Sequence, residues 1–237
     1  QSAKAIFKKW GLDFSIIGKT TNTNNLVLRY NESEVANLPL SSLSTEAPLY
    51  DRKYKKNNIS KKTNLKKDFS KINVLDALKK ILMSPNNSDK SWVWEQYDQT
   101  VMGDTIQKPG GDSAVVRIHD KNKGVAIAVD SSAQYCKANS LMGSKQVVSE
   151  TWRNLISVGA SPLAITNCLN FGNPEKENIM GQFVESIEGI SEACKYLDFP
   201  VVSGNVSFYN GTNKKNISPT PVIGGVGLIQ KYKKPMD

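Results

Sequence analysis

From residue 114 onward, the hydrophobic positions alternate between the two-residue spacing of strands and the wider spacing of helices. Residues 114–118 and 125–129 are β-type runs on either side of a polar turn, which predicts a hairpin. Residues 145–158 carry one apolar helical stripe, and Gly159 stands where a C-terminal cap is expected. This alternation predicts a mixed α/β domain.

The same alternation continues beyond this helix. Residues 163–168 and 222–229 are strand-like, and 201–203 predict a short buried strand that ends at Gly204. Between these strands, Asn173 is a candidate N-cap with Pro at the first helical position, and an apolar stripe follows it. We therefore expect a long helix between two of the strands.

The first seventy residues show a weaker pattern. Short β-type runs at 13–18 and 26–30 are too few for an independent core, so we interpret this part as the tail of a domain whose body lies upstream. Ser70 would cap a helix that Ser84-Pro85 ends. The expected organisation is a domain tail at 1–54, a basic linker at 55–68 and a second domain at 69–237.

Charge is concentrated in one segment. The chain has 31 Lys and Arg against 22 Asp and Glu, a net charge of +9. Residues 51–71 hold nine basic and two acidic residues, a net of +7. Because the segment has almost no aromatic residues to stack on bases, we interpret it as a solvated linker without fixed contacts and expect no nucleic-acid partner.

Other features of composition exclude further classes of protein. No apolar run approaches the ~20 residues of a membrane span, and no signal peptide is visible, so we expect no membrane association and a cytoplasmic location. The three cysteines, Cys136, Cys168 and Cys194, are widely spaced and predict core packing, not zinc binding or disulfides. His119, the single histidine, is interpreted as a solvated turn residue.

Polar side chains gather where the expected strands end. Asp130, Asn167 and Asn170 close strands, and residues 203–207 follow another. Carboxylate and amide oxygens at a sheet edge can reach the Mg²⁺ of a nucleotide, and glycine lets backbone approach a phosphate. The pattern indicates a nucleotide site, but the same residues are common turn formers, so both interpretations stay open.

Long motifs give a more specific indication. Residues 91–98 (SWVWEQYD), 109–115 (PGGDSAV), 167–176 (NCLNFGNPEK) and 200–210 (PVVSGNVSFYN) resemble the small-type synthetase subunit of phosphoribosylformylglycinamidine synthase. Residues 47–52 (APLYDR) resemble the family's signature before its interdomain linker. The motifs follow the family's order and cover nearly the whole chain apart from the linker.

The resemblance implies a fold. It is an aminoimidazole ribonucleotide synthetase-like N-terminal domain, α+β with a mixed β-sheet and flanking helices, preceded by the tail of an α+β C-terminal-type domain. In this family the synthetase consists of two homologous halves, each with an N-terminal and a C-terminal domain. The catalytic histidines lie in the first half, which would be upstream of Gln1. Ser132 aligns with one of them, so the isolated chain is expected to be inactive and to contribute ligand groups only.

The resemblance also implies a reaction. It is the ATP-dependent amidation of formylglycinamide ribonucleotide in purine synthesis, with Mg²⁺, and with ammonia from a glutaminase subunit joined by a small bridging subunit. By position, Asn167 and Gly204 resemble ATP contacts, Asn205 a Mg²⁺ ligand and Ser207 a substrate contact. The family usually has Asp at position 167, and the neutral Asn would weaken a charge-based role.

Two further interpretations remain open. Asp130 and Asn154 align with metal ligands of the first half and would serve an auxiliary nucleotide. A nucleotide-binding module without catalysis would account for the polar strand ends equally well. A paired histidine motif upstream of Gln1 would favour the ligase.

Overall fold

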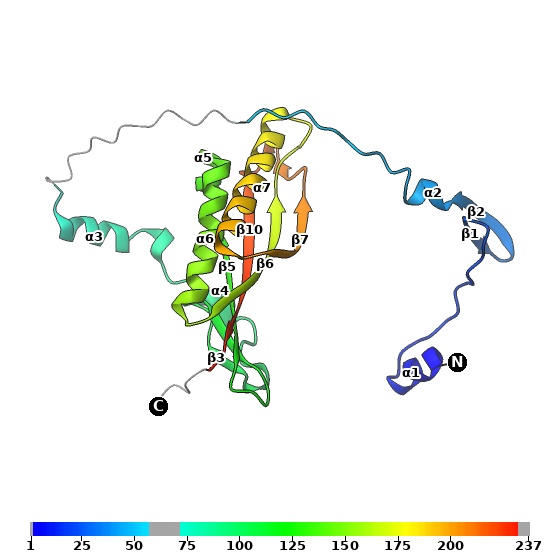
Figure 1. Cartoon of the computed structure of the whole chain (residues 1–237), viewed down its shortest axis with the longest axis horizontal. Helices are drawn as coiled ribbons and strands as arrows, with labels where there is room; N and C mark the ends of the chain where they lie inside the picture. Colours follow the sequence, from blue (N-terminus) through cyan, green and yellow to red (C-terminus); the bar gives the residue numbers. More distant parts are fainter. Residues whose placement is uncertain (1, 57–71, 232–237) are drawn as a thin grey trace. The chain divides into compact units, whose positions relative to one another are not determined.

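A computed structural model of the chain describes residues 2–56 and 72–231 (Figure 1). By its internal contacts the chain divides into two units, Gln1–Asp51 and Arg52–Asp237. Residues 52–56 therefore belong with the second unit. Most of the predicted linker, and Ser70 with it, lies outside the described residues.

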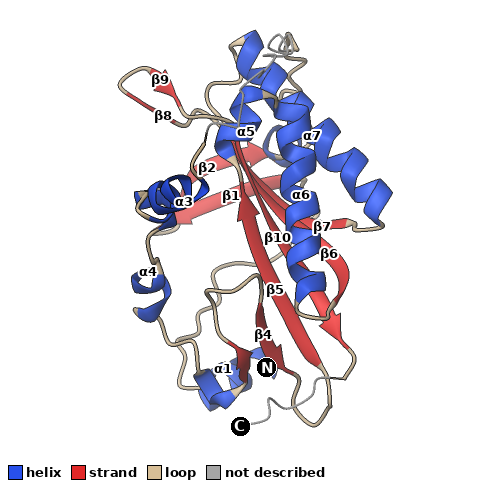
Figure 2. Ribbon diagram, turned by 90° about the vertical axis from the view of Figure 1, so that its left-hand side faces the viewer, coloured by secondary structure: helices blue, strands red, loops and turns tan. Residues whose placement is uncertain are grey.

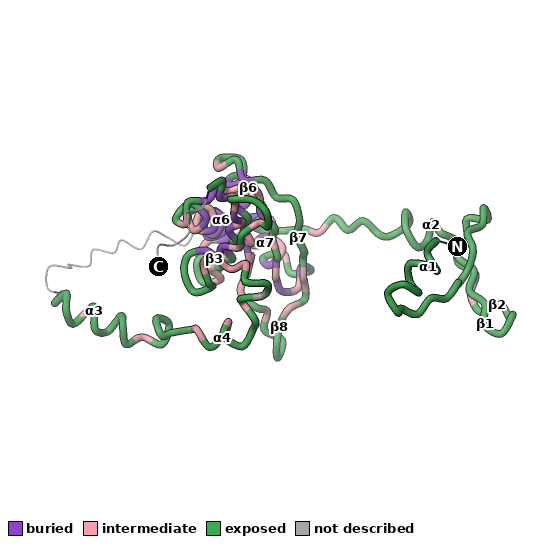
Figure 3. The backbone as a smooth tube through the Cα atoms, turned by 90° about the horizontal axis from the view of Figure 1, so that it is seen from below, coloured by how far each residue is buried: buried purple, intermediate pink, exposed green. Residues whose placement is uncertain are grey.

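The first unit is small and open. Its two strands, β1 (Asn25–Tyr30) and β2 (Ser33–Pro39), form an antiparallel hairpin. The strand predicted at 13–18 is wrong, because this run is irregular and has no pairing partner among the described residues. No described residue of the unit is buried (Figure 3). Its helices are α1 (Ser2–Lys9) and α2 (Leu40–Leu43).

The second unit is built on one mixed sheet with the order β3-β4-β5-β10-β6-β7. Figure 2 labels five of these strands, from β4 to the edge strand β7. Neighbouring strands are antiparallel except β6 and β7, which are parallel. Helix α7 connects these two strands, as a parallel pair requires. The strands are β3 (Thr105–Gln107), β4 (Ala114–Arg117), β5 (Gly124–Ser131), β6 (Ser161–Asn170), β7 (Val201–Ser207) and β10 (Thr220–Ile229).

Helices cover one face of this sheet. Helices α6 and α7 pack against each other and lie over the central strands (Figure 1). The segment that connects β7 to β10 in the sequence contains a short hairpin, formed by β8 (Gly211–Thr212) and β9 (Lys215–Asn216). The helices are α3 (Val74–Leu82), α4 (Ser91–Glu95), α5 (Ala133–Ala138), α6 (Ser140–Ser157) and α7 (Glu177–Leu197), with 3₁₀ turns at Pro85–Asn87 and Val101–Gly103.

The core lies between the helices and the sheet. Leu155 of α6 and Phe199 after α7 are fully buried against β10. Glycine is required on that strand, since a Cβ at Gly225 would lie 2.5 Å from Thr151 Cγ2 and 3.1 Å from Leu155 Cδ1. On the opposite face of the sheet, Ile127, Val129 and Val226 are exposed.

Several predicted boundaries shift in the structure. The N-cap of α3 is Asn73, whose Oδ1 accepts hydrogen bonds from the next backbone amides, and the N-cap of α7 is Lys176, not Asn173. Gly159 has φ +79°, as its predicted place after a helix requires. The strand predicted to stop at Gly204 continues to Ser207, and it is an exposed edge strand where a buried one was predicted.

No helix within the described ranges has the length and apolar character needed to cross a membrane.

The close contact between β10 and α6 gives the first prediction. Gly225→Ala should lower the free energy of unfolding by about 1–3 kcal/mol, because the added methyl meets buried atoms that cannot move away. Gly224→Ala is the matched control on the open face, where the nearest atom is Cγ2 of the exposed Thr166. Urea unfolding of both variants makes the comparison, and equal losses would contradict this explanation of the core.

Candidate functional site

One row of residues crosses the helix-covered face of the sheet. Ile223 of β10 lies opposite Asp130 of β5 on one side and Asn167 of β6 on the other, and Asn167 lies opposite Gly204 of β7. Opposed residues in neighbouring strands share a face, so the row runs from a carboxylate in the sheet to the exposed edge strand. Its two polar residues, Asp130 and Asn167, and also Gly204 are among the residues that the sequence singled out.

Asn167 and Gly204 form the tightest contact of this row. A Cβ at Gly204 would overlap Asn167 Oδ1, so only glycine lets the amide side chain lie across the strand. The sequence interpretation gave Gly204 the role of admitting a phosphate. In the structure, the space that a side chain at position 204 would occupy is filled by the side chain of Asn167.

Asn205 and Ser207 lie on the opposite face. They are opposed to Cys168 and Asn170 of β6, and successive residues of a strand point to alternate faces. The four candidate residues therefore form two pairs on two faces of the sheet. Both pairs include a residue of β7, and because β7 is the exposed edge strand, this edge is where the two faces meet.

Ser207 begins a loop that other side chains hold in place. The Asn210 amide nitrogen lies 3.0 Å from both the carbonyl oxygen and the Oγ of Ser207, and it also donates to the Phe171 carbonyl. The Phe171 amide donates in turn to the Ser207 carbonyl at 2.9 Å. The loop is thus tied to the end of β6, next to the start of the α7 crossover.

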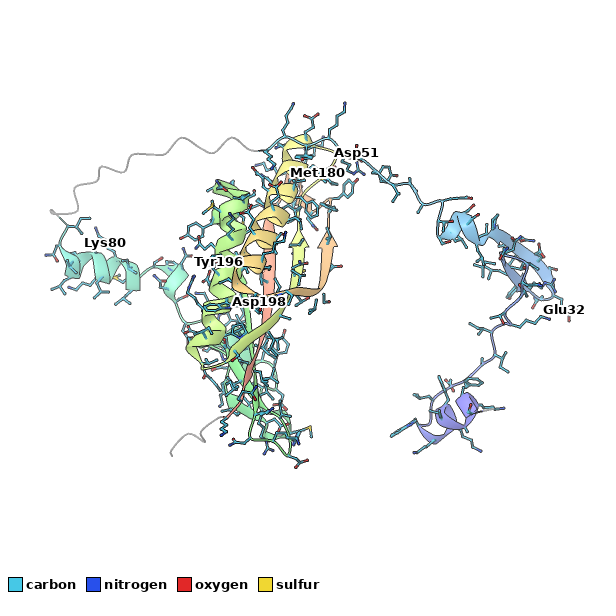
Figure 4. The ribbon with its side chains drawn as sticks, viewed as in Figure 1. Glu32, Asp51, Lys80, Met180, Tyr196 and Asp198 are labelled. Carbon is cyan, nitrogen blue, oxygen red and sulfur yellow. The ribbon has the colours of Figure 1, made fainter. Side chains whose placement is uncertain are left out.

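A cleft of about 430 Å³ lies beside Asn167 of β6, between the C-terminal half of α7 and the start of β7 at Val201. Its wall includes Ser191, and Lys195 and Asp198 supply opposite charges near the end of α7, where Figure 4 labels Asp198. The remaining lining residues are mostly apolar. The cleft therefore provides a partly apolar space with a few polar groups next to the Asn167–Gly204 pair, as ligand pockets do.

At the other end of the row, Asp130 faces α6. Asn154 donates its side-chain amide to Asp130 Oδ1 at 2.9 Å, and Ser113 Oγ donates to the Asn154 carbonyl. Within the described residues, Asp130 Oδ2 is buried without a hydrogen-bond partner. Burial raises the pKa of Asp130, and the neighbouring Thr151 hydroxyl and Asn154 amide offset this only partly. Asp130 and Asn154 do lie together, as their shared assignment requires.

The histidine and cysteine predictions have mixed outcomes. His119 is exposed in the turn after β4, with Nε2 2.7 Å from Asp104 Oδ2, in agreement with its interpretation as a turn residue. Cys136 and Cys194 are buried as predicted, but Cys168 is exposed on the open face, so its prediction as a core residue is wrong. The described part of the chain contains no cluster of three or more His, Cys, Asp or Glu side chains placed to hold a metal ion.

Sequence reasoning missed contacts at the start of the linker. Lys55 pairs with Glu177 and Lys56 with Glu188, both at 2.7 Å, so the expectation of no fixed contacts is wrong for these two lysines. Arg52 reaches Tyr209 beside the Ser207 loop. The only sequence signal was that Arg52 and Tyr209 each belong to a recognised motif, at 47–52 and 200–210.

Residues 110–229 match the sequence pattern of the AIR synthase related protein N-terminal domain, and the chain belongs to this family. The chain is 58% identical to the phosphoribosylformylglycinamidine synthase subunit PurL of Pelagibacter ubique, over 98% of this chain and 32% of that protein. It is 51% identical to the protein of the same name from Bradyrhizobium diazoefficiens, over 99% of this chain and 32% of that protein. The resemblance inferred from the motifs is confirmed.

Solved structures agree with the fold. PurL of Thermotoga maritima complexed with ATP has a TM-score of 0.66 and 29% identity, covering 89% of this chain and 33% of that one. The FGAR complex has a TM-score of 0.65 with 29% identity, covering 87% and 31%. The PurLQS structure from the same organism has a TM-score of 0.69 with 29% identity, covering 88% and 32%. The chain thus spans about a third of the length of the curated relatives it matches.

The raised pKa of Asp130 predicts a pH-dependent stability difference. The Asp130 carboxyl keeps its proton to a higher pH in the folded chain than in the unfolded chain. As the pH rises above 3.8, the ordinary pKa of an aspartate, ionisation of Asp130 therefore lowers the stability of the fold. Asp130→Asn should therefore gain stability relative to wild type as the pH rises from about 3 past the raised pKa of Asp130 in the folded chain. Urea unfolding at a series of pH values measures the difference, and a difference independent of pH would oppose the prediction.

The Asn167–Gly204 contact predicts strong coupling. Gly204→Ala should lower the free energy of unfolding by roughly 1–3 kcal/mol, because its methyl would overlap Asn167 Oδ1. The same substitution in an Asn167→Ala background should cost much less, because the overlapping oxygen is absent. A double-mutant cycle by urea unfolding tests this, and additive effects would show that the two side chains do not interact.

Proposed function

We propose that this chain is the part of a synthetase that supplies nucleotide and substrate contacts for converting formylglycinamide ribonucleotide to formylglycinamidine ribonucleotide with ATP. The observation that carries the proposal is the Asn167–Gly204 pair beside a cleft, in a chain closely similar to proteins of that name. The ATP and FGAR complexes of the Thermotoga maritima structures support the choice of ligands.

The residues of the candidate site fit an ATP–Mg²⁺ group in part. Asn167 offers an amide beside the cleft, and the edge strand at Gly204 is open to solvent. Asn205 and Ser207 lie on the other face of the same sheet edge, where Asn205 would hold Mg²⁺ through its amide oxygen and Ser207 would contact the ribonucleotide. Bound Mg²⁺ neutralises the charge of the triphosphate, which assists phosphoryl transfer. An Asn at position 167 adds hydrogen bonds and no charge.

The chain's own groups would bind and orient the ligands and exclude water from the reacting atoms. Proton transfer is not assigned to His119, because that side chain is engaged with Asp104. We place the catalytic histidines in the first half of the synthetase, so this chain alone would be inactive. Glutamine would be the amido donor, through a glutaminase subunit and a small bridging subunit, in the cytoplasm. The Thermotoga maritima assembly titled PurLQS supports the existence of partner subunits.

Three substitutions in the full-length synthetase test the proposal. Gly204→Val should raise the KM for ATP, because its side chain displaces Asn167 and fills the approach to the strand. Asn205→Leu should raise the Mg²⁺ concentration needed for half-maximal rate. Ser207→Ala should weaken binding of formylglycinamide ribonucleotide by about 0.5–1.5 kcal/mol through one lost hydrogen bond. Steady-state kinetics with ATP, Mg²⁺ and substrate varied in turn separates the three effects.

Lys214→Gln, at an exposed turn residue of the β8–β9 hairpin, is the control and should behave as wild type. Three variants with wild-type constants and stability would remove the site assignment. A full-length protein that binds ATP but forms no amidine product would instead identify a nucleotide-binding module without catalysis. Turnover by this chain alone, free of host enzyme, would contradict the placement of the chemistry in the first half.

A further inference from the structure

Residues 52–56, which lead into the predicted linker, are held along the first half of α7. The Lys55 amide donates to the Glu177 carbonyl at 2.9 Å, and the Lys55 carbonyl lies so close to Gly181 that a Cβ there would overlap it. Lys56 Nζ lies 2.7 Å from both carboxylate oxygens of Glu188. We call residues 52–56 the strap. Backbone and side-chain contacts together hold it in one position on the helix.

The first residue of the strap contacts the Ser207 loop. Arg52 donates from one guanidinium nitrogen to the Tyr209 hydroxyl at 3.4 Å, and a second nitrogen lies 3.9 Å from Glu175 Oε1. The Tyr209 hydroxyl donates to the same carboxylate oxygen at 3.1 Å. Only 26% of the Arg52 side chain is exposed. The three side chains therefore join the strap, the start of the α7 crossover and the loop after β7.

Tyr209 has a backbone conformation that needs such support. Its φ is +61°, in the left-handed region that side chains other than glycine seldom occupy. Residues in that region persist where surrounding contacts determine their conformation. Here the Tyr209 amide donates to the Gly172 carbonyl at 3.0 Å, and the hydroxyl at the far end is held by Arg52 and Glu175. The contacts at both ends thus fix a strained residue two positions after Ser207.

We infer that Arg52 is a positioning residue, which acts through Tyr209 to hold Ser207 in place for the ribonucleotide substrate. This inference rests on the proposed function, because it concerns the same Ser207 contact. It assigns the strap a role in substrate binding.

Tyr209→Phe and Arg52→Met in the full-length synthetase test the inference. Each should raise the KM for formylglycinamide ribonucleotide about 3- to 10-fold, the range expected for one lost hydrogen bond, with little change in kcat or in the KM for ATP. The double variant should show no more than the larger single effect, because the two substitutions remove the same interaction. Arg52→Lys should restore part of the binding, since it keeps a donor at this position.

Lys56→Met is the matched control, because it removes a strap cation that contacts α7 and not Tyr209. It should leave the KM for both substrates unchanged. Equal KM increases in the control and in Arg52→Met would show a general effect of the strap and overturn the inference, as would wild-type constants in Arg52→Met and Tyr209→Phe. Those results would leave the proposed function standing, whereas a wild-type synthetase without amidation activity would remove the proposed function itself.

Discussion

The close packing of α6 on the central strand β10 is the constraint on which the second unit depends. Gly225 lies beneath Thr151, Leu155 and Phe199, and the separation there is too small for any side chain. Burial of the helix stripe is the main favourable contribution, and it requires the helix to approach the backbone of the sheet. Once α6 is fixed, α7 packs beside it and determines where the parallel strand β7 joins β6.

This arrangement also explains why the polar residues lie in rows. The antiparallel register of β10 with both β5 and β6 places Asp130 and Asn167 on either side of Ile223, and the parallel register of β7 adds Gly204. The covering helices provide Asn154 at one end of the row and Ser191 at the other. A carboxylate under a helix loses solvation and its pKa rises, whereas the neutral Asn167 beside the cleft carries no such cost.

Strands and helices with a clear spacing could be predicted from the sequence. The runs at 125–129 and 222–229 fall within observed strands, and the run at 114–118 matches β4 except for its last residue, because each combines β-branched residues with turn signals. The run at 13–18 is also rich in β-type residues but pairs with no strand among the described residues, and pairing is a tertiary property that composition does not contain.

The candidate site could be predicted only in part from the sequence. A motif identifies the residues of a site, but it does not show on which face of the sheet each residue lies. The sequence predicts that residues 203–207 follow a buried strand, since Gly and Asn commonly end strands. They continue an exposed edge strand instead, and alternation along it sends Asn205 to the face opposite Gly204. That division depends on the register of two strands separated by the α7 crossover, which local sequence does not determine.

The strap shows why a basic segment was misread as solvated throughout. Exposed ion pairs such as Lys55–Glu177 contribute little to stability, because water screens them and two long side chains must be ordered. The lysines therefore do not by themselves account for the fixed position of this segment. The backbone hydrogen bond from Lys55 to Glu177 and the fit of the Lys55 carbonyl against Gly181 are short-range contacts that a charge count does not reveal. The position of the strap is thus set by a glycine in α7, far along the chain from the charges that made the segment conspicuous.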